Sequence, residues 1–232
     1  MHKGIFITGT DTGVGKTYIA AGLIRAFKKM GLSVCPVKPV ETGCGTFNKR
    51  LVPADALKLV SAAEADEPLG LINPYRFKQP LAPAVAAEHE GASISKKKII
   101  SACGQISKKY DITIVEGAGG IMVPVYRKYL FIDLMQDLAM PITIVARPGL
   151  GTINHTLLTI EAARSRGLRI LGVIINCADR TRRSLSEKTN PEVVERLGGV
   201  PLLGIVGYSK DPLGRAAQKV HRRIAEQILS RS

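Results

Sequence analysis

Short apolar runs alternate along the chain with longer segments in which apolar residues recur at helical spacing. The runs predict buried strands at residues 3–8, 34–37, 112–115, 142–145, 171–175 and 202–206. The longer segments predict helices over residues 16–30, 53–60 and 131–140, two that end near Lys109 and Arg166, and one at the C-terminus. Strands and helices in alternation predict an α/β fold with a mostly parallel sheet and helices on both of its faces.

Polar, glycine and proline residues separate these elements and predict loops and helix caps. The expected loops are an exposed one at 44–52, a proline-containing one at 71–90 with a short helix near 84–89, and a basic one at 178–190. The expected helix starts are Ser93 or Ser95 as cap of the helix that ends near Lys109, Thr152 or Asn154 as cap of the helix that ends at Arg166, and Pro191 as the first residue of a further short helix.

The first strand and the first helix are joined by Gly9-Thr10-Asp11-Thr12-Gly13-Val14-Gly15-Lys16-Thr17. Glycines in such a turn let backbone N–H groups crowd around phosphate oxygens, because no Cβ is in the way. The start of the helix adds unsatisfied donors and the positive end of its dipole. Lys16 would supply charge to the outer phosphates of a nucleotide, and Thr17 a hydroxyl to Mg²⁺. The segment therefore predicts a P-loop NTPase-like phosphate site.

The spacing within this loop is unusual. Five residues separate Gly9 from Gly15, whereas the usual pattern has four between its first glycine and its Gly-Lys pair. The longer loop indicates an uncommon branch of these proteins. The alternative interpretation is an ordinary strand–turn–helix with a solvated lysine, and the ordered strand, glycines, Gly-Lys-Thr and helix argue against it.

Two other strands end in residues that suit the same chemistry. Lys38 and Thr42 follow the strand at 34–37, and Glu116 follows the strand at 112–115. In an open α/β sheet, ligands bind at the carboxyl ends of the strands. An acidic residue at the tip of an apolar strand, in a chain with a phosphate loop, is typical of a group that holds Mg²⁺. Taken alone, Glu116 would be interpreted as a solvated strand end.

The length and the cysteines limit the class of protein. A chain of 232 residues fits one α/β domain over residues 1–232. No apolar run approaches the ~18 residues that span a bilayer, so no membrane partner is expected. The first strand begins almost at once, which leaves no room for a signal peptide. The four cysteines include no Cys-x-x-Cys pair, so a cytoplasmic location is predicted and neither disulfides nor a zinc site are.

The formal charge of +14 leaves two interpretations open. One is a nucleic-acid partner. The other is a soluble surface rich in Lys and Arg, with some bias toward anionic ligands. Much of the excess lies at residues 96–98, 180–183 and 215–223, and few aromatic residues accompany it. Platforms on which bases could stack are therefore not expected, and neither is a nucleic-acid partner.

Taken together, the motifs resemble those of the dethiobiotin synthetase family. The matching segments are residues 9–17, 38–43, 55–56, 73–75, 115–120 and 151–155. They follow the family's order within residues 5 to about 208, nearly the whole chain. The long phosphate loop with its Thr-Asp-Thr and the Glu-Gly-Ala-Gly-Gly block carry most of the resemblance.

The resemblance implies an ATP-dependent cyclo-ligase of biotin biosynthesis. Its substrates would be ATP, CO₂ and 7,8-diaminononanoate. One amine is carboxylated, and the carbamate takes the γ-phosphoryl group of MgATP to give a carbamic-phosphoric anhydride. The second amine then closes the cyclic urea of dethiobiotin, with release of ADP and phosphate.

The resemblance also assigns roles to residues of this chain. Mg²⁺ would be held by Thr17, Asp55 and Glu116, and the transferred phosphoryl group would lie between the catalytic lysines Lys16 and Lys38. The diamine would contact Thr42, and its carboxylate the helix start of a second subunit in a homodimer, at Gly151, Thr152, Ile153 and Asn154. ATP would contact Gly13, Val14, Gly15, Lys16, Thr17, Tyr18, Asp55, Glu116, Gly117, Ala118, Gly119, Asn176, Cys177, Gly207 and Tyr208, with Asn176 reading the adenine edge and Gly207 and Tyr208 lining the base pocket.

The chain departs from the family pattern in three places. Thr42 stands where some members carry Ser, which keeps the hydroxyl. Ala82 also stands where some members carry Ser, so a hydrogen bond to substrate is lost there. The basic loop at 178–190 has no counterpart that we can place.

Two other classes share parts of this pattern. A partitioning ATPase of the ParA/MinD type would suit the basic charge, but it usually carries an extra lysine early in its phosphate loop, where this chain has Thr10, Asp11 and Thr12. It also lacks the block at 38–42. An amidoligase that acts on a cobalamin precursor would be longer and would carry a nucleophilic Cys in a glutaminase domain.

Overall fold

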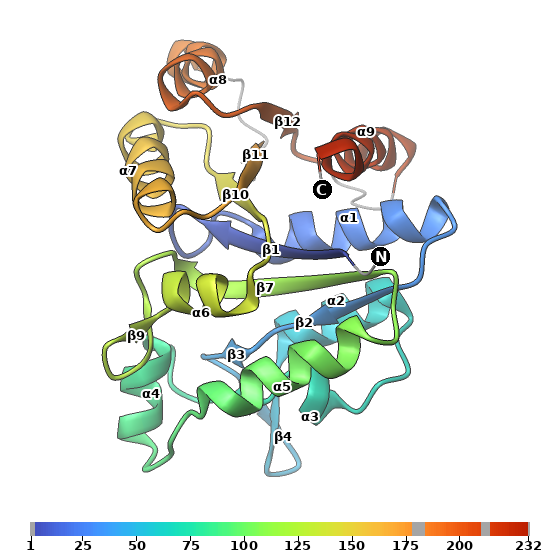
Figure 1. Cartoon of the computed structure of the whole chain (residues 1–232), viewed down its shortest axis with the longest axis vertical. Coiled ribbons are helices and arrows are strands. Elements are labelled where there is room, and N and C mark those ends of the chain that lie inside the picture. Colours follow the sequence, from blue (N-terminus) through green and yellow to red (C-terminus); the bar gives the residue numbers. More distant parts are fainter. Residues whose placement is uncertain (1–2, 178–183, 210–213, 232) are drawn as a thin grey trace.

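The computed structural model describes residues 3–177, 184–209 and 214–231. At its centre lies a sheet in the order β12-β11-β10-β1-β7-β2, in which every neighbouring pair is parallel (Figure 1). Its strands are β1 (Lys3–Gly9), β2 (Val34–Val37), β7 (Ile112–Gly120), β10 (Ile142–Ala146), β11 (Ile170–Asn176) and β12 (Leu202–Val206). The predicted α/β fold with a mostly parallel sheet is confirmed.

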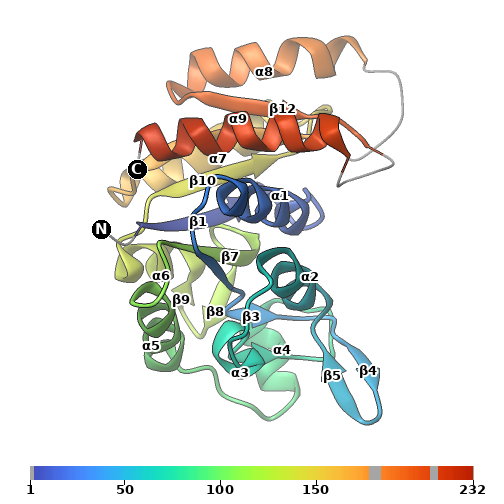
Figure 2. The same cartoon turned by 90° about the vertical axis from the view of Figure 1, so that its right-hand side faces the viewer.

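Helices cover both faces of this sheet (Figures 1 and 2). One face packs against α1 (Lys16–Lys29), α2 (Ala54–Ala63) and α9 (Arg215–Arg231). The other face packs against α5 (Lys96–Ser107), α6 (Phe131–Leu138), α7 (Thr152–Ser165) and α8 (Leu185–Gly198). The strands are buried on both sides, which explains why they appear in the sequence as continuous apolar runs.

The register of the sheet brings the predicted site residues together. Val37 of β2 pairs with Val115 of β7, so Lys38 and Glu116 are the next residues on two neighbouring strands. Glu116 in turn lies beside Ile7 of β1, close to where the phosphate loop leaves that strand. Because parallel strands end at the same edge, residues far apart in sequence meet there.

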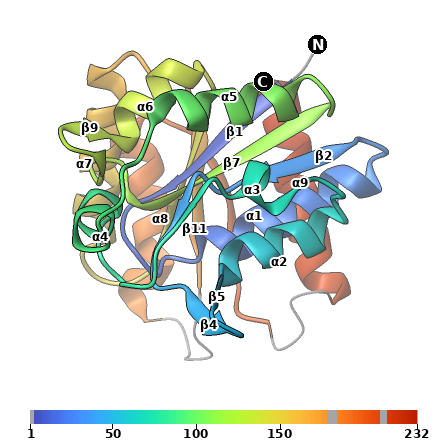
Figure 3. The same ribbon diagram turned by 90° about the horizontal axis from the view of Figure 1, so that it is seen from below.

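Smaller elements lie beyond this edge. They are β3 (Val40–Glu41), β4 (Gly45–Phe47), β5 (Arg50–Val52), α3 (Leu69–Ile72), β6 (Tyr75–Arg76), α4 (Pro83–His89), β8 (Pro124–Tyr126) and β9 (Tyr129–Leu130). The loop predicted at 44–52 is exposed over residues 45–50 only, and it forms an antiparallel hairpin that projects beside α2 (Figure 3). Its turn is made by Asn48 and Lys49, both at positive φ. Neither residue is the glycine that usually marks such a turn, so the sequence did not predict the hairpin.

Two predicted helix starts are wrong. Neither Thr152 nor Asn154 caps α7; Gly151 does, at φ 85°, and the Thr152 hydroxyl lies 3.4 Å from that of Thr156. Pro191 lies inside α8, which begins at Leu185 after the cap Ser184. A capping box that Ser184 forms with the following turn starts the helix earlier than the proline suggested.

The other expected cap is confirmed. Ser95 is the N-cap of α5, where its hydroxyl accepts from the backbone N–H of Lys98 at 3.4 Å.

Of the basic loop predicted at 178–190, residues 178–183 lie outside the described part of the chain, and residues 185–190 belong to α8. Across the described residues, no helix combines the length and the apolar character needed to cross a membrane.

Candidate active site

The phosphate loop connects β1 to α1 and is shaped by its glycines. Gly15 is the N-cap of α1 at φ 91°, and Gly13 has φ 75°. Asn176, at the end of β11, packs against this turn and donates from Nδ2 to the carbonyl of Val14 at 3.0 Å. A Cβ at Gly15 would lie 2.0 Å from that nitrogen. Gly15 is therefore required both for its φ and for the close approach of Asn176.

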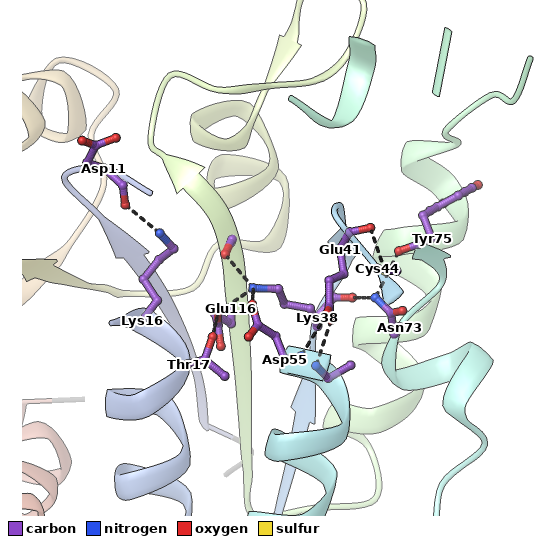
Figure 4. A network of polar contacts seen from close by, with 12 residues as sticks. Asp11, Lys16, Thr17, Lys38, Glu41, Cys44, Asp55, Asn73, Tyr75 and Glu116 are labelled. Carbon is purple, nitrogen blue, oxygen red and sulfur yellow. Dashed lines mark hydrogen bonds and ion pairs between the residues drawn. The ribbon is translucent and has the colours of Figure 1, made fainter. Parts of the chain in front are cut away.

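Lys16 lies inside this loop with 7% of its surface exposed (Figure 4). Its Nζ donates to the backbone carbonyl of Asp11 at 2.8 Å, and the Asp11 carboxylate pairs with Arg147 at 2.7 Å. Burial, together with the charge of Lys38, lowers the pKa of the Lys16 amine to about 8. A negatively charged ligand would favour the charged form of this amine, because an opposite charge nearby offsets the desolvation.

Lys38 joins the two predicted acidic ligands. Its Nζ lies 2.5 Å from Glu116 Oε1 and 3.4 Å from Asp55 Oδ2, and it also donates to the carbonyl of Gly117 at 3.3 Å (Figure 4). The Thr17 hydroxyl donates to the same Glu116 oxygen at 2.8 Å. Burial alone would lower the pKa of the Lys38 amine, but the carboxylates of Glu116 and Asp55 outweigh it and raise that pKa. The amine is therefore held as an ammonium in a buried place.

Two further residues hold these side chains in position. Glu41 accepts from the backbone N–H groups of Asp55 and Ala56, each at 2.9 Å, and so caps the start of α2. Burial raises the pKa of the Glu41 carboxyl. Asn73 donates from its amide to the backbone carbonyl of Lys38 at 2.7 Å. Glu41 thus positions Asp55, and Asn73 positions Lys38.

The donor set fits Mg²⁺. Thr17, Asp55 and Glu116 present hydroxyl and carboxylate oxygens, the hard ligands that Mg²⁺ prefers. Glu116 Oε2 is buried and has no hydrogen-bond partner in the described structure. An orphaned carboxylate oxygen in a buried site needs a cation or donor to compensate its desolvation. In the described residues no three His, Cys, Asp or Glu side chains form a metal cluster.

A cleft of about 590 Å³ opens over these groups. It is lined by Thr12, Gly13, Gly15, Lys16, Thr17, Tyr18, Lys38, Glu41, Thr42, Asp55, Lys58, Pro80, Leu81, Ala82, Pro83, Glu116, Ala118, Gly119 and Val123. Residues predicted from separate segments, including both lysines, Thr42 and the three expected metal ligands, therefore share one cavity. The cleft is large enough for a nucleotide tail and a small substrate.

Other predicted residues lie outside the lining of this cleft. Val14 is buried within the phosphate loop, and Asn176 is buried beside it. The Gly117 carbonyl accepts from Lys38, and Cys177 is buried after β11. Gly207 and Tyr208 are exposed after β12. Gly151, Thr152, Ile153 and Asn154 form the start of α7, where Thr152 is buried and Asn154 exposed.

The sequence reasoning gave no site role to several residues of the cleft. Glu41 and Lys58 resemble ordinary solvated charges, and Val123 a core residue. The segment 80–83, in which Ala82 was expected beside the substrate, does line the cleft. The one available signal for Glu41 was its position between Lys38 and Thr42, as the acidic residue of that segment.

Comparison with known proteins agrees with this geometry. A family model described as an AAA domain matches residues 3–213. An ATP-dependent dethiobiotin synthetase of Thermodesulfovibrio yellowstonii is 42% identical over 230 residues, which cover 94% of this chain and 96% of that protein. The chain belongs to the dethiobiotin synthetase family. Synthetases of this family from Methanocaldococcus jannaschii and Bacillus subtilis are 42% and 43% identical over 89% and 88% of the chain, and the matches cover 95% and 86% of those proteins.

Solved structures show how widely the fold is shared. The cell division ATPase MinD of Pyrococcus furiosus matches with a TM-score of 0.60 at 19% identity over the full length of both chains. A ParA family ATPase of Chlorobium tepidum matches with a TM-score of 0.55 at 19% identity over 98% of this chain and 91% of that one. These likenesses concern the fold alone, whereas the dethiobiotin synthetases match in sequence as well.

Proposed function

We propose that the chain catalyses the ATP-dependent carboxylation and ring closure of 7,8-diaminononanoate to dethiobiotin. The observation that carries this proposal is the buried Lys38 ammonium between Glu116 and Asp55, in the same cleft as Lys16 of the phosphate loop. Two cations beside one phosphate site suit a reaction that transfers a phosphoryl group between anionic oxygens. Relatives at about 40% identity are named for this activity.

The reaction balances in three steps. One amine of the substrate attacks CO₂, forms an N–C bond and loses a proton, which gives a carbamate. A carbamate oxygen attacks the γ-phosphorus, and the bond from that phosphorus to ADP breaks. The second amine then attacks the carbonyl carbon and loses a proton, the bond from carbon to the phosphate oxygen breaks, and phosphate leaves with the urea ring closed.

This chain's residues would mainly align reactants and neutralise charge. Lys16 and Lys38 would bind the γ-phosphoryl oxygens on which charge develops, and Thr42 would hold the substrate near them. Backbone N–H groups of the phosphate loop and the segment from Glu116 to Gly119 would hold phosphate and carbamate oxygens. Thr17, Asp55 and Glu116 would hold Mg²⁺, which neutralises the triphosphate when bound.

The remaining assignments are part of the same proposal. The adenine would lie near Asn176, Cys177, Gly207 and Tyr208. The substrate carboxylate would lie at the α7 start of a second subunit, residues 151–154, because a helix N-terminus favours an anion. The protein would act as one domain and as a homodimer in the cytoplasm, where its four buried cysteines would stay reduced.

A leave-one-out assay tests the proposal. We expect phosphate release only when ATP, Mg²⁺, bicarbonate and the diamine are all present. ATP turnover that is unchanged without the diamine, or stimulated by DNA, would support a switch ATPase of the ParA/MinD class instead.

A further inference from the structure

A second cavity, of about 330 Å³, lies between α1 and α9. Figure 2 shows the two helices on the same face of the sheet. Its cationic side chains are Arg25 and Lys29 from α1 and Arg215, Lys219 and Arg222 from α9. No acidic side chain of the described residues lines it. Arg25 is about two and a half helical turns along α1 from Lys16. This groove is therefore distinct from the cleft described above.

The charges of this groove are only partly compensated. Arg222 pairs with Glu226 at 3.0 Å, and Lys29 donates to Gln218 at 2.5 Å. Arg25, Arg215 and Lys219 have no ion pair with any acidic residue of the described structure. Like charges that converge in a concave site repel one another and raise the local potential for an anion.

A buried imidazole forms part of the wall. His221 is 2% exposed, and its Nδ1 lies 2.8 Å from the carbonyl of Ala217. Its Nε2 has no hydrogen-bond partner in the described structure. The ring fits only because residue 22 is glycine, since a Cβ there would lie 2.3 Å from Nε2. Because Nε2 packs against Gly22 and the ring is almost fully buried, His221 shapes the wall of the groove, and it is the uncompensated cations that favour an anion there.

We propose that the groove between α1 and α9 binds a small phosphate-bearing anion. Arg25 and Lys219 contact its phosphate oxygens from opposite helices, and Arg215 adds charge at the start of α9. The groove favours a small ligand over nucleic acid, because among the described residues that line it only His221 bears a ring, and that ring is buried in the wall and offers no platform for base stacking. The site lies outside the catalytic cleft, and its existence does not depend on the reaction proposed above.

Calorimetry with inorganic pyrophosphate tests this site. The full chain is first saturated with Mg²⁺ and a non-hydrolysable ATP analogue, so that the phosphate loop is filled, and magnesium pyrophosphate is then titrated in. We expect one pyrophosphate per chain. The double variant Arg25→Ala, Lys219→Ala should weaken this binding at least tenfold, while ring closure measured without pyrophosphate stays unchanged.

The matched control is Arg223→Ala, which removes an exposed charge from the same helix outside the groove. It should change pyrophosphate affinity by less than twofold. Absence of pyrophosphate binding would overturn the proposal. An equal loss of pyrophosphate affinity in the control variant would also overturn it. So would single-stranded DNA that binds more tightly than pyrophosphate and depends on Arg223 as much as on Arg25. Either result would indicate diffuse surface charge.

Discussion

Lys38 Nζ lies 2.5 Å from Glu116 Oε1 although 78 positions separate the two residues in sequence. The parallel pairing of β2 with β7 makes them neighbours, because Val37 and Val115 are opposite one another. Removing one member of such a buried pair leaves an uncompensated charge, and a buried ion pair by itself is weak evidence for stability. We therefore interpret the pair as a feature of the site, in which Lys38 is held ready for the phosphoryl group.

Replacing Lys38 tests that interpretation. In Lys38→Ala we expect kcat to fall by about a hundredfold or more, because the ammonium acts on charge that develops in the transition state. Affinity for a non-hydrolysable ATP analogue should change by only a few-fold, since Lys16 and the loop backbone remain. Steady-state kinetics with calorimetry measure both quantities.

The control for that variant is Lys97→Ala, which removes an exposed charge from α5. It should leave kcat and nucleotide affinity unchanged. A Lys38→Ala protein that is folded by circular dichroism and turns over at the wild-type rate would remove Lys38 from the mechanism.

Glu41 should act through Asp55. In Glu41→Ala the backbone N–H groups of Asp55 and Ala56 lose their hydrogen-bond acceptor at the start of α2. We therefore expect the free energy of unfolding to fall by about 1–2 kcal/mol. Because Asp55 then loses its fixed position, the Mg²⁺ concentration for half-maximal activity should rise several-fold. Glu41→Gln should recover part of both effects, since its amide oxygen still accepts.

Ser184→Ala is the matched control, because the Ser184 hydroxyl also accepts from a backbone N–H of a first helical turn, that of α8, and Ser184 is remote in sequence from Glu41 and Asp55. It should lower the free energy of unfolding by about 1 kcal/mol and leave the Mg²⁺ dependence unchanged. Equal shifts of Mg²⁺ dependence in Ser184→Ala and Glu41→Ala would mean that Glu41 matters only for stability.

His221 should make stability depend on pH. Burial, together with the charge of Arg25, lowers the pKa of its imidazole below the usual 6.5, so the native state holds it neutral. Below pH 6.5 the unfolded chain binds a proton that the native state resists, and stability is lost as pH falls from 6.5 toward the native pKa. Urea unfolding at pH 7.5 and 5.5 should therefore show a larger loss for the wild type than for His221→Phe. Identical losses would contradict this assignment.

Much of the site was accessible from sequence because its signals are local. The glycine-rich segment at 9–17 lies between a strand and a helix, and Lys38 and Glu116 directly follow apolar runs. Parallel strands bring such ends to one edge, so the pattern alone predicts that they meet. The cleft contains Lys16, Lys38, Thr42, Asp55 and Glu116 together.

The role of Glu41 and two of the helix starts depend on contacts that no local sequence pattern encodes. Glu41 caps α2 from 14 positions away, so its role exists only once β3 and α2 are packed. Gly151 is the cap of α7 because its backbone adopts φ 85°. The sequence favoured Thr152 and Asn154 instead, because Thr and Asn are common N-cap residues. Pro191 lies inside α8 and does not begin it, because the capping box at Ser184 places the helix start at Leu185.

The proposed chemistry is tested most directly by following oxygen. Bicarbonate labelled with ¹⁸O is added with MgATP and the diamine, and the released phosphate is analysed by mass spectrometry within the time in which bicarbonate keeps its label. Because a carbamate oxygen bonds to the γ-phosphorus and leaves with it, each phosphate should carry one ¹⁸O and appear with one molecule of cyclic urea. Phosphate without label, formed at the same rate, would show that water attacks ATP and would contradict the proposed reaction.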